Sequence, residues 1–165
     1  MNLTAKSRYA LKIMMDLALN DDLHQRQRQK IATRQGIPID FMDHILARLR
    51  DHGLIRSTRG RSGGLSLKKQ SGDISLWEIF SAVEENLYPV RCMDESGCAF
   101  EQNCITLDVW GDVYRDIRFV LSGRSLRQVC DKLNARNTAT VLSALSDPTH
   151  SPECRRPVRH LTERA

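Results

Sequence analysis

The stretch Arg34-Gln-Gly-Ile-Pro-Ile-Asp-Phe-Met-Asp-His-Ile-Leu-Ala-Arg-Leu-Arg50 decides the fold of this chain. Gly36 is suited to end a short helix that runs from about Arg28 to Gln35, and Pro38 is suited to begin the next helix. The second helix carries an apolar stripe at helical spacing and ends at Gly53; its stripe residues are Phe41, Ile45, Leu46 and Leu49. Two short helices joined through a glycine predict a helix-turn-helix.

The segment that follows is predicted to form a β-hairpin. Residues 54–59 and 65–67 alternate apolar and polar side chains, and the glycine-rich stretch Gly60-Arg-Ser-Gly-Gly64 lies between them. A hairpin directly after a helix-turn-helix is a wing. Arg59 and Arg61 flank its tip, where arginine can reach a phosphate or enter a narrow minor groove.

Further helices are expected on both sides of this unit. Residues 3–20, with Thr4 placed as a cap, and residues 74–83 have helical periodicity. A longer helix over 105–121 carries a stripe that we expect to form a dimer interface: Leu107, Trp110, Tyr114, Ile117 and Leu121. The predicted fold is mainly α with a small β-hairpin wing. Its parts are a winged helix-turn-helix domain over 1–85, a cysteine loop over 86–106, a dimerisation helix and a short last helix over 105–133, and a disordered tail over 134–165.

Charge is distributed unevenly along the 165 residues. The chain has a net charge of +5, yet residues 1–70 alone contain fourteen Lys and Arg against six Asp and Glu. A concentrated positive segment is typical of proteins that bind a polyanion, because contacts to phosphates release counterions. A solvated surface is the simpler alternative. We expect double-stranded promoter DNA as the partner because the basic segment contains the helix-turn-helix and the wing.

Three of the five cysteines, Cys92, Cys98 and Cys104, are evenly spaced within a polar segment. Thiolates are soft ligands that select zinc, copper(I) or iron-sulfur clusters, so this loop is a candidate metal site. Burial as small apolar residues is the alternative, but the segment lacks apolar periodicity. An odd cysteine count, with no signal peptide and no apolar run of membrane-spanning length, predicts a cytoplasmic protein with reduced thiols and no membrane association.

The DNA-contacting residues are expected on the second helix of the pair, the first helix and the wing. Carboxylates such as Asp43 can accept a hydrogen bond from cytosine N4, and arginines can contact guanine or phosphate. A carboxylate in this position repels phosphate, which suggests selection between sites. The full set of candidates is Thr4, Lys6, Ser7, Asp40, Phe41, Asp43, His44, Arg48, Arg50, Arg59, Arg61, Ser62 and Gly63.

The order of these motifs resembles the Rrf family of winged-helix regulators, and within it the iron-sulfur cluster regulators. The resemblance covers about residues 1–130 and rests on the cysteine triplet together with four stretches: Leu3-Thr-Ala-Lys-Ser-Arg-Tyr-Ala10, Arg34-Gln-Gly-Ile37, Leu49-Arg-Asp-His-Gly-Leu54 and Arg59-Gly-Arg-Ser-Gly-Gly64. It implies a homodimeric transcription factor, expected to be a repressor, that senses iron, redox state or nitric oxide. It also implies a [2Fe-2S] or [4Fe-4S] cluster on Cys92, Cys98 and Cys104.

The chain departs from the family pattern at the fourth ligand. The cluster regulators have a histidine three residues after the third cysteine, and this chain has Leu107. Some relatives use a carboxylate from the first helix of the partner subunit, but the matching position here is Arg8. Asp108 is the nearest oxygen donor, although one residue turns it by about 100° around a helix.

Two other functions compete with cluster sensing. Zinc binding or thiol oxidation at the same cysteines would keep the DNA-binding module without a cluster. An enzyme with a nucleophilic cysteine is disfavoured, because the five histidines lie in the DNA-binding segment or the tail, away from the cysteine loop.

Overall fold

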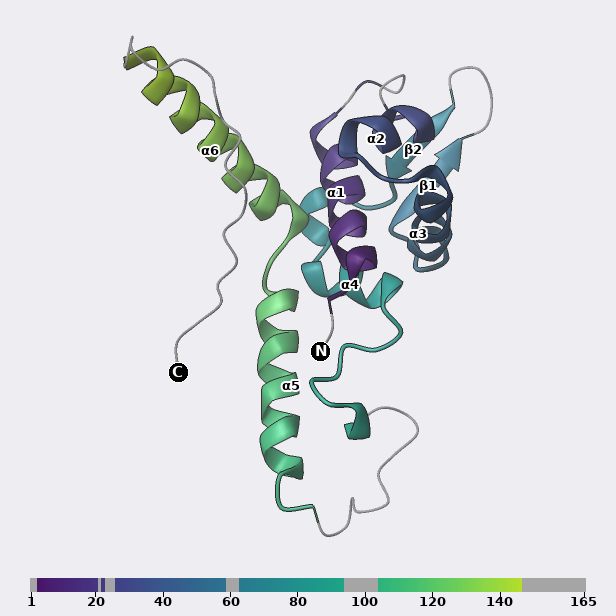
Figure 1. Cartoon of the computed structure of the whole chain (residues 1–165), viewed down its shortest axis with the longest axis vertical. Coiled ribbons are helices and arrows are strands. Elements are labelled where there is room, and N and C mark those ends of the chain that lie inside the picture. Colours follow the sequence, from purple (N-terminus) through teal and green to yellow (C-terminus); the bar gives the residue numbers. More distant parts are fainter. Residues whose placement is uncertain (1–2, 21, 23–25, 59–62, 94–103, 147–165) are drawn as a thin grey trace. The chain divides into compact units, whose positions relative to one another are not determined.

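A computed structural model describes residues 3–20, 22, 26–58, 63–93 and 104–146 of the chain (Figure 1). It divides into two compact units, Met1–Lys132 and Leu133–Ala165. The expected wing-tip residues Arg59, Arg61 and Ser62 lie outside the described residues, as does Cys98. Within the described residues, no helix combines the length and the apolar character that a membrane span requires.

The helix-turn-helix is confirmed. It consists of α2 (Arg28–Gln35) and α3 (Ile39–Asp51), which follow α1 (Ala5–Leu19). Gly36 ends α2 with φ 63° and ψ 43°, a left-handed conformation that glycine adopts without steric cost. The Ile37 N–H donates to the Ala32 carbonyl at 2.9 Å and the Gly36 N–H to the Thr33 carbonyl at 3.3 Å. These two bonds form a Schellman motif, which fixes the direction in which the chain leaves α2.

The wing is confirmed as an antiparallel hairpin of β1 (Ile55–Thr58) and β2 (Gly64–Leu67). Ile55 is opposite Leu67 and Ser57 is opposite Leu65. The Leu65 N–H also donates to the Arg26 carbonyl at 3.0 Å. The wing is therefore held against the residues that lead into α2.

A short α4 (Leu76–Val83) follows a 3₁₀ turn at Ser71–Asp73, and its start is stabilised by a capping box between Ser75 and Glu78. The main chain near the beginning of α6 pairs with the same segment: the Leu126 N–H donates to the Ile74 carbonyl at 2.8 Å. The core lies where α1, α3 and α4 pack together with α2 and the wing (Figure 1). Its largest fully buried side chains are Ile13, Met14, Leu17, Ile31, Met42, Leu49, Leu54, Ile74, Ile79, Val83 and Leu126.

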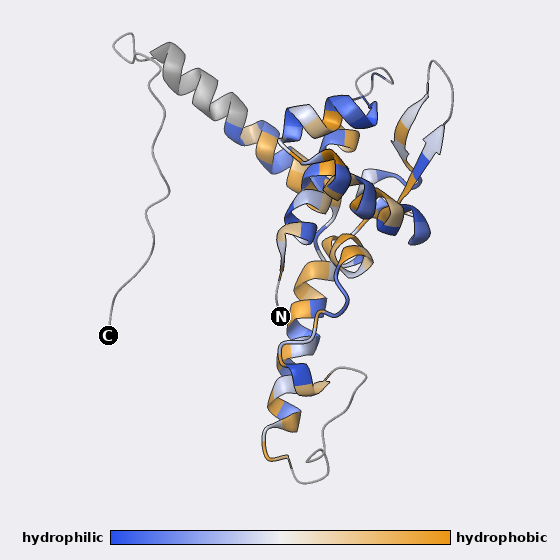
Figure 2. Cartoon of the chain, turned by 45° about the vertical axis from the view of Figure 1, so that its right-hand side comes forward, coloured by the Kyte–Doolittle hydropathy of each residue, from blue (hydrophilic) through white to orange (hydrophobic). Residues whose placement is uncertain are grey.

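The long helix α5 (Leu107–Ser122) is confirmed, and part of its predicted stripe packs within the chain. Tyr114, which belongs to the stripe expected at a dimer interface, contacts Trp77 and Tyr88 of the same chain, with ring centroids 5.8 and 4.8 Å apart. The most exposed hydrophobic side chains on α5 are outside the stripe, namely Val109 at 58%, Phe119 at 79% and Val120 at 56%, whereas Leu107 of the stripe is 38% exposed. Figure 2 shows hydrophobic positions recurring along this helix. The stripe of the prediction thus partly covers its own domain, and a different face is exposed.

The last helix was predicted to be short, and this is a correction: α6 runs Leu126–Ser146 instead of ending near 133. The segment after Asn134 is polar, but it contains several alanines and leucines and has no proline before Pro148. Alanine and leucine favour helices, and polarity alone does not end one. The rest of the expected tail, residues 147–165, lies outside the described residues.

Candidate nucleic-acid interface and cysteine site

The polar residues of α3 form one continuous face. Successive residues of a helix are about 100° apart, which puts Asp40, Asp43, His44, Arg48 and Arg50 on the side opposite the buried residues of the helix, namely Met42, Ile45, Leu46 and Leu49. Asp40 lies in the first turn and the two arginines in the last, as the helix dipole favours. A helix that reads a DNA groove presents a polar face of this kind.

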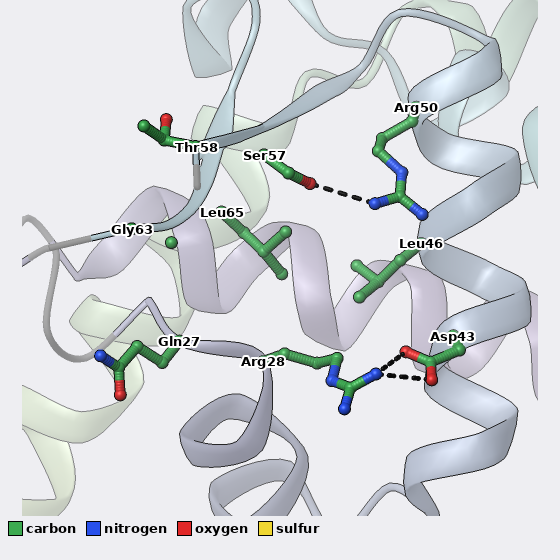
Figure 3. A pocket seen from close by; sticks show the side chains of 10 residues that line it. Gln27, Arg28, Asp43, Leu46, Arg50, Ser57, Thr58, Gly63 and Leu65 are labelled. Atoms are coloured by element: carbon green, nitrogen blue, oxygen red, sulfur yellow. Dashed lines mark hydrogen bonds and ion pairs between the residues drawn. The ribbon is translucent and has the colours of Figure 1, made fainter. Parts of the chain in front are cut away.

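On one side of this face, an open hollow of about 570 Å³ lies between α3, the wing and the start of α2 (Figure 3). The guanidinium Nη1 of Arg50 donates to the Ser57 hydroxyl at 3.2 Å, which joins the end of α3 to β1. Gly63, a predicted site residue, lines the same hollow. The sequence prediction that α3 and the wing act on one ligand is consistent with this arrangement.

The hollow also contains an ion pair that the sequence analysis did not identify. Nη1 of Arg28, at the start of α2, lies 2.7 Å from Oδ1 and 2.6 Å from Oδ2 of Asp43 (Figure 3). The two side chains are 48% and 47% exposed. Asp43 is therefore an ion-paired carboxylate and not the isolated negative charge that its place in the sequence predicts.

On its other side, α3 borders a second hollow of about 360 Å³, which includes Lys6 from α1 and Arg48 and His44 from α3. Phe41 also lines this hollow and packs edge-on against Tyr9, with ring centroids 5.5 Å apart. Phe41 thus helps to position α3 on α1. Lys6 and Arg48 therefore place positive charge along this side of α3.

Ser7 does not fit the backbone contact predicted for it, and this is a correction. The residue is only 2% exposed, and its hydroxyl donates to Glu84 Oε1 at 2.6 Å. The same oxygen accepts from the Thr4 N–H at 2.9 Å and the Thr4 hydroxyl at 2.8 Å. Ser7 and Thr4 therefore bind the end of α4 to the start of α1. Thr4 itself is exposed and remains a candidate for a phosphate contact.

A second buried carboxylate fixes α2 on α1. Asp16, whose side chain is 1% exposed, accepts hydrogen bonds from Arg34 Nε at 2.7 Å and Nη2 at 2.6 Å. Gln35 Nε2 adds a bond of 2.7 Å. Burial alone would raise the pKa of Asp16, but the hydrogen bonds from Arg34 and Gln35 outweigh it, so the pKa lies below its ordinary value. The two-bond ion pair between Arg34 and Asp16 thus holds α2 on α1, in addition to apolar packing.

The cysteine site is described at its two ends. Cys92 is exposed in a 3₁₀ turn at Arg91–Met93, and Cys104 is partly exposed just before α5; both are free thiols. Hydrogen bonds from the Thr106 hydroxyl and backbone, together with the Leu107 N–H, lower the pKa of Cys104 although desolvation opposes them. Such a thiol fits the thiolate that metal and cluster ligation require.

The described residues do not form a complete ligand set. Among them, no three His, Cys, Asp or Glu side chains come together where they could hold a metal ion. The expected third ligand, Cys98, lies outside the described residues. Leu107 is the first residue of α5 and its apolar side chain offers no donor atom. Two accessible thiols therefore fit a cluster as ligands, and the fourth position has no donor from residue 107.

The fold and the α3 face define the class of this protein, a winged helix-turn-helix regulator. The chain belongs to the Rrf2 family, whose model, described as an iron-dependent transcriptional regulator, matches residues 3–132. A similar protein from Cronobacter sakazakii, the HTH-type transcriptional regulator IscR, is 35% identical over 159 residues, or 96% of this chain and 93% of that protein.

Solved structures of similar fold agree with this assignment. The structure of T. potens IscR has a TM-score of 0.61 and 25% sequence identity, and the match covers 81% of this chain and 88% of that one. CymR, the global cysteine regulator of B. subtilis, has a TM-score of 0.60 and 21% identity, and the match covers 80% of this chain and 98% of that one. The second likeness concerns the fold alone.

Sequence reasoning missed three functional or structural partners: Arg28, Arg34 and Glu84. Each pairs with a residue that lies far away in the chain; Glu84, for example, is separated from Ser7 by 77 positions. Local periodicity contains no signal for such pairs. The only signal for Arg28 in the sequence is a positive charge at the start of α2, the helix that precedes α3.

Proposed function

We propose that this Rrf2-family regulator binds promoter DNA as a homodimer and that an iron-sulfur cluster on Cys92, Cys98 and Cys104 controls the binding. The observation that carries the DNA-binding part is the polar face of α3, bordered by the wing on one side and by Lys6 on the other. The odd number of cysteines and the accessible thiols are consistent with action in the cytoplasm, where thiols stay reduced.

In this proposal α3 enters the major groove. Asp40, Asp43 and His44 face base edges, while Arg48 and Arg50 contact guanine or phosphate. Lys6 and Thr4 contact the backbone beside α1. The wing residues Arg59, Arg61, Ser62 and Gly63 would lie toward the flanking minor groove; of these, only Gly63 is among the described residues.

The dimer would form through α5. Its exposed hydrophobic residues Val109, Phe119 and Val120 lie on a helix on which no residue is fully buried within the chain. Exposed apolar surface of this kind is a usual site of protein association. We propose that this surface binds α5 of a second copy of the chain. Two winged helix-turn-helix domains related by a two-fold axis would then bind the two half-sites of a DNA site.

The cysteine loop connects α4 to α5 and is therefore placed between the DNA-binding domain and the proposed dimer helix. Cys104 lies just before α5, and Cys92 follows α4 by nine residues. When bound, the cluster would supply chemistry that responds to oxygen, nitric oxide or iron supply. The residues Cys92 and Cys104 would tie the two ends of the loop together, and a difference in DNA affinity between the two states would make this a switch.

Thiol chemistry without a cluster is a second candidate, favoured by one observation. Cys104 combines partial exposure with a lowered pKa, which are the two properties of an oxidant-sensitive thiol. The same loop would then respond to oxidation. Zinc at the cysteines is a related alternative, although it also requires a fourth ligand that residue 107 does not offer.

One experiment separates these sensing chemistries. The full chain is purified without oxygen beside Cys92→Ala, and visible absorption, iron and acid-labile sulfide are measured. The cluster proposal expects a coloured protein with iron and sulfide, and loss of all three signals in Cys92→Ala. A colourless wild-type protein without iron would rule out the cluster and leave zinc or thiol oxidation, which a zinc assay and thiol titration then distinguish.

A further inference from the structure

The ion pair between Arg28 and Asp43 joins the two helices of the helix-turn-helix, α2 and α3, at the edge of the polar face of α3. Both carboxylate oxygens of Asp43 lie within 2.7 Å of Arg28 Nη1 (Figure 3). The pair is about half exposed, so it is open to a ligand on that side. Asp43 therefore carries a charge that a neighbouring guanidinium largely compensates.

The surroundings hold Arg28 in this position. The bond between the Leu65 N–H and the Arg26 carbonyl fixes the segment before α2 against the wing. Leu46 and Leu65 line the same hollow, with the Arg28–Asp43 pair on one side of them and the Arg50–Ser57 contact on the other (Figure 3). The arginine is thus part of the wall between α2, α3 and the wing.

We propose that Arg28 sets the base preference of α3 by neutralising Asp43; this rests on the proposed DNA-binding function. An unpaired carboxylate in the groove attracts the amino group of a cytosine but is repelled by phosphates and by base acceptors. With Arg28 in contact, a site without a cytosine opposite Asp43 carries a smaller penalty. Arg28 is a positioning residue that acts through Asp43 and broadens the set of DNA sites.

A direct phosphate contact by Arg28 is the alternative, and it makes a different prediction. Loss of a phosphate contact weakens binding about uniformly across sequences. Loss of charge compensation weakens binding selectively, at sites where no cytosine faces Asp43, and only while Asp43 is present. The two roles can therefore be separated by measuring sequence dependence in two backgrounds.

The test starts by selecting DNA from random duplexes with the full wild-type chain and with Asp43→Asn. The position at which cytosine preference changes identifies the base that faces residue 43. Two duplexes that differ only there are then titrated with wild type, Arg28→Leu, Asp43→Asn and the double variant, at one salt concentration. Lys30→Leu, which removes the same charge from an exposed position of the same helix, is the matched control.

We expect Arg28→Leu to weaken binding to the duplex without the cytosine about tenfold more than binding to the duplex with it. In the Asp43→Asn background, Arg28→Leu should weaken both duplexes equally, as Lys30→Leu should in wild type. The ion pair is solvent-exposed and contributes little to folding, so Arg28→Leu should melt within a few degrees of wild type, which confirms a folded variant.

Two results would overturn the proposal while leaving DNA binding intact. One is an equal loss of affinity for both duplexes in both backgrounds, which would make Arg28 a phosphate contact. The other is an unchanged base preference in Asp43→Asn. If the wild-type chain selects no DNA, either as purified without oxygen or after iron removal, the proposed function itself fails and this inference fails with it.

Discussion

Ser7 donates a 2.6 Å hydrogen bond to Glu84, and this bond joins the first turn of α1 to the residue that directly follows α4. Glu84 Oε1 accepts three further bonds, from the Thr4 N–H, the Thr4 hydroxyl and the Ser7 N–H. The carboxylate therefore satisfies donors at a helix N-terminus, where negative charge is favoured. Glu84 is only 8% exposed, and the residues after it lead into the cysteine loop.

Replacing this carboxylate should destabilise the domain. Glu84→Ala leaves the buried Ser7 hydroxyl and backbone N–H without their acceptor, and we expect a loss of about 1–3 kcal/mol in the free energy of unfolding. Chemical denaturation measures it. Glu85→Ala is the matched control, because Glu85 is exposed and its 3.9 Å contact to Lys6 should contribute less than about 1 kcal/mol. Equal losses in the two variants would contradict this role for Glu84.

The same site predicts a pH dependence. Burial alone would raise the pKa of Glu84, but hydrogen bonds from Ser7 and Thr4 outweigh it and hold the pKa below its ordinary value of 4.5. The ionised Glu84 carboxylate therefore contributes its full stabilisation to the folded state above the ordinary pKa of 4.5. This contribution is lost as the pH falls below 4.5 and through the lowered pKa, because the carboxylate is then protonated in the folded state as well. The stability gap between wild type and Glu84→Gln should be constant from neutral pH to pH 5 and should narrow below it. Melting curves over this range would disprove the assignment if the gap stayed constant.

One substitution should have opposite effects at two glycines. Gly36 has φ 63° with no atom within 4 Å of an added Cβ, so Gly36→Ala meets no clash and should cost about 1–2 kcal/mol from the left-handed backbone alone. Gly111 lies inside α5 and also has open space around it, so Gly111→Ala should stabilise by about 0.5–1 kcal/mol. Urea titration of both variants is the measurement. If both variants were stabilised, or both destabilised, backbone conformation would not decide the change in the free energy of unfolding.

The exposed face of α5 predicts the oligomeric state. Phe119→Glu places a charge on the most exposed large hydrophobic side chain of the helix, which is 79% exposed in the single chain. We expect the dimer to dissociate to monomers in sedimentation experiments, because burial of an unpaired carboxylate is costly. Gln29→Glu adds the same charge at an exposed position of α2, outside α5, and should leave the dimer intact. Dimers in both variants would place the interface elsewhere.

The helices and the hairpin could be predicted because their signals are local. Gly36, Pro38 and the apolar stripe of α3 lie within a few residues of one another and determine the ends of α2 and α3. In the same way, the alternation of apolar and polar residues and the glycine-rich stretch between the strands predict the hairpin of the wing. The predicted end of α6 near residue 133 is wrong, because polarity after Asn134 does not by itself end a helix and the first proline comes only at 148.

The partners within the candidate site could not be predicted in the same way. Arg28 and Asp43 are fifteen positions apart, and their contact depends on how α2 and α3 cross. The stripe of α5 was predicted correctly as helical, but periodicity does not say whether Tyr114 faces its own domain or another chain. In both cases the missing information is the three-dimensional packing of elements, which residue spacing alone does not contain.

The coupling between the cysteine loop and DNA is the central claim, and one binding experiment tests it directly. DNA affinity is measured for the full chain purified without oxygen and for the same sample after iron removal, with Cys92→Ala treated in parallel. The account predicts that iron removal changes the affinity of the wild type by about fivefold or more, and leaves that of Cys92→Ala unchanged. Identical affinities of the two wild-type forms would contradict it.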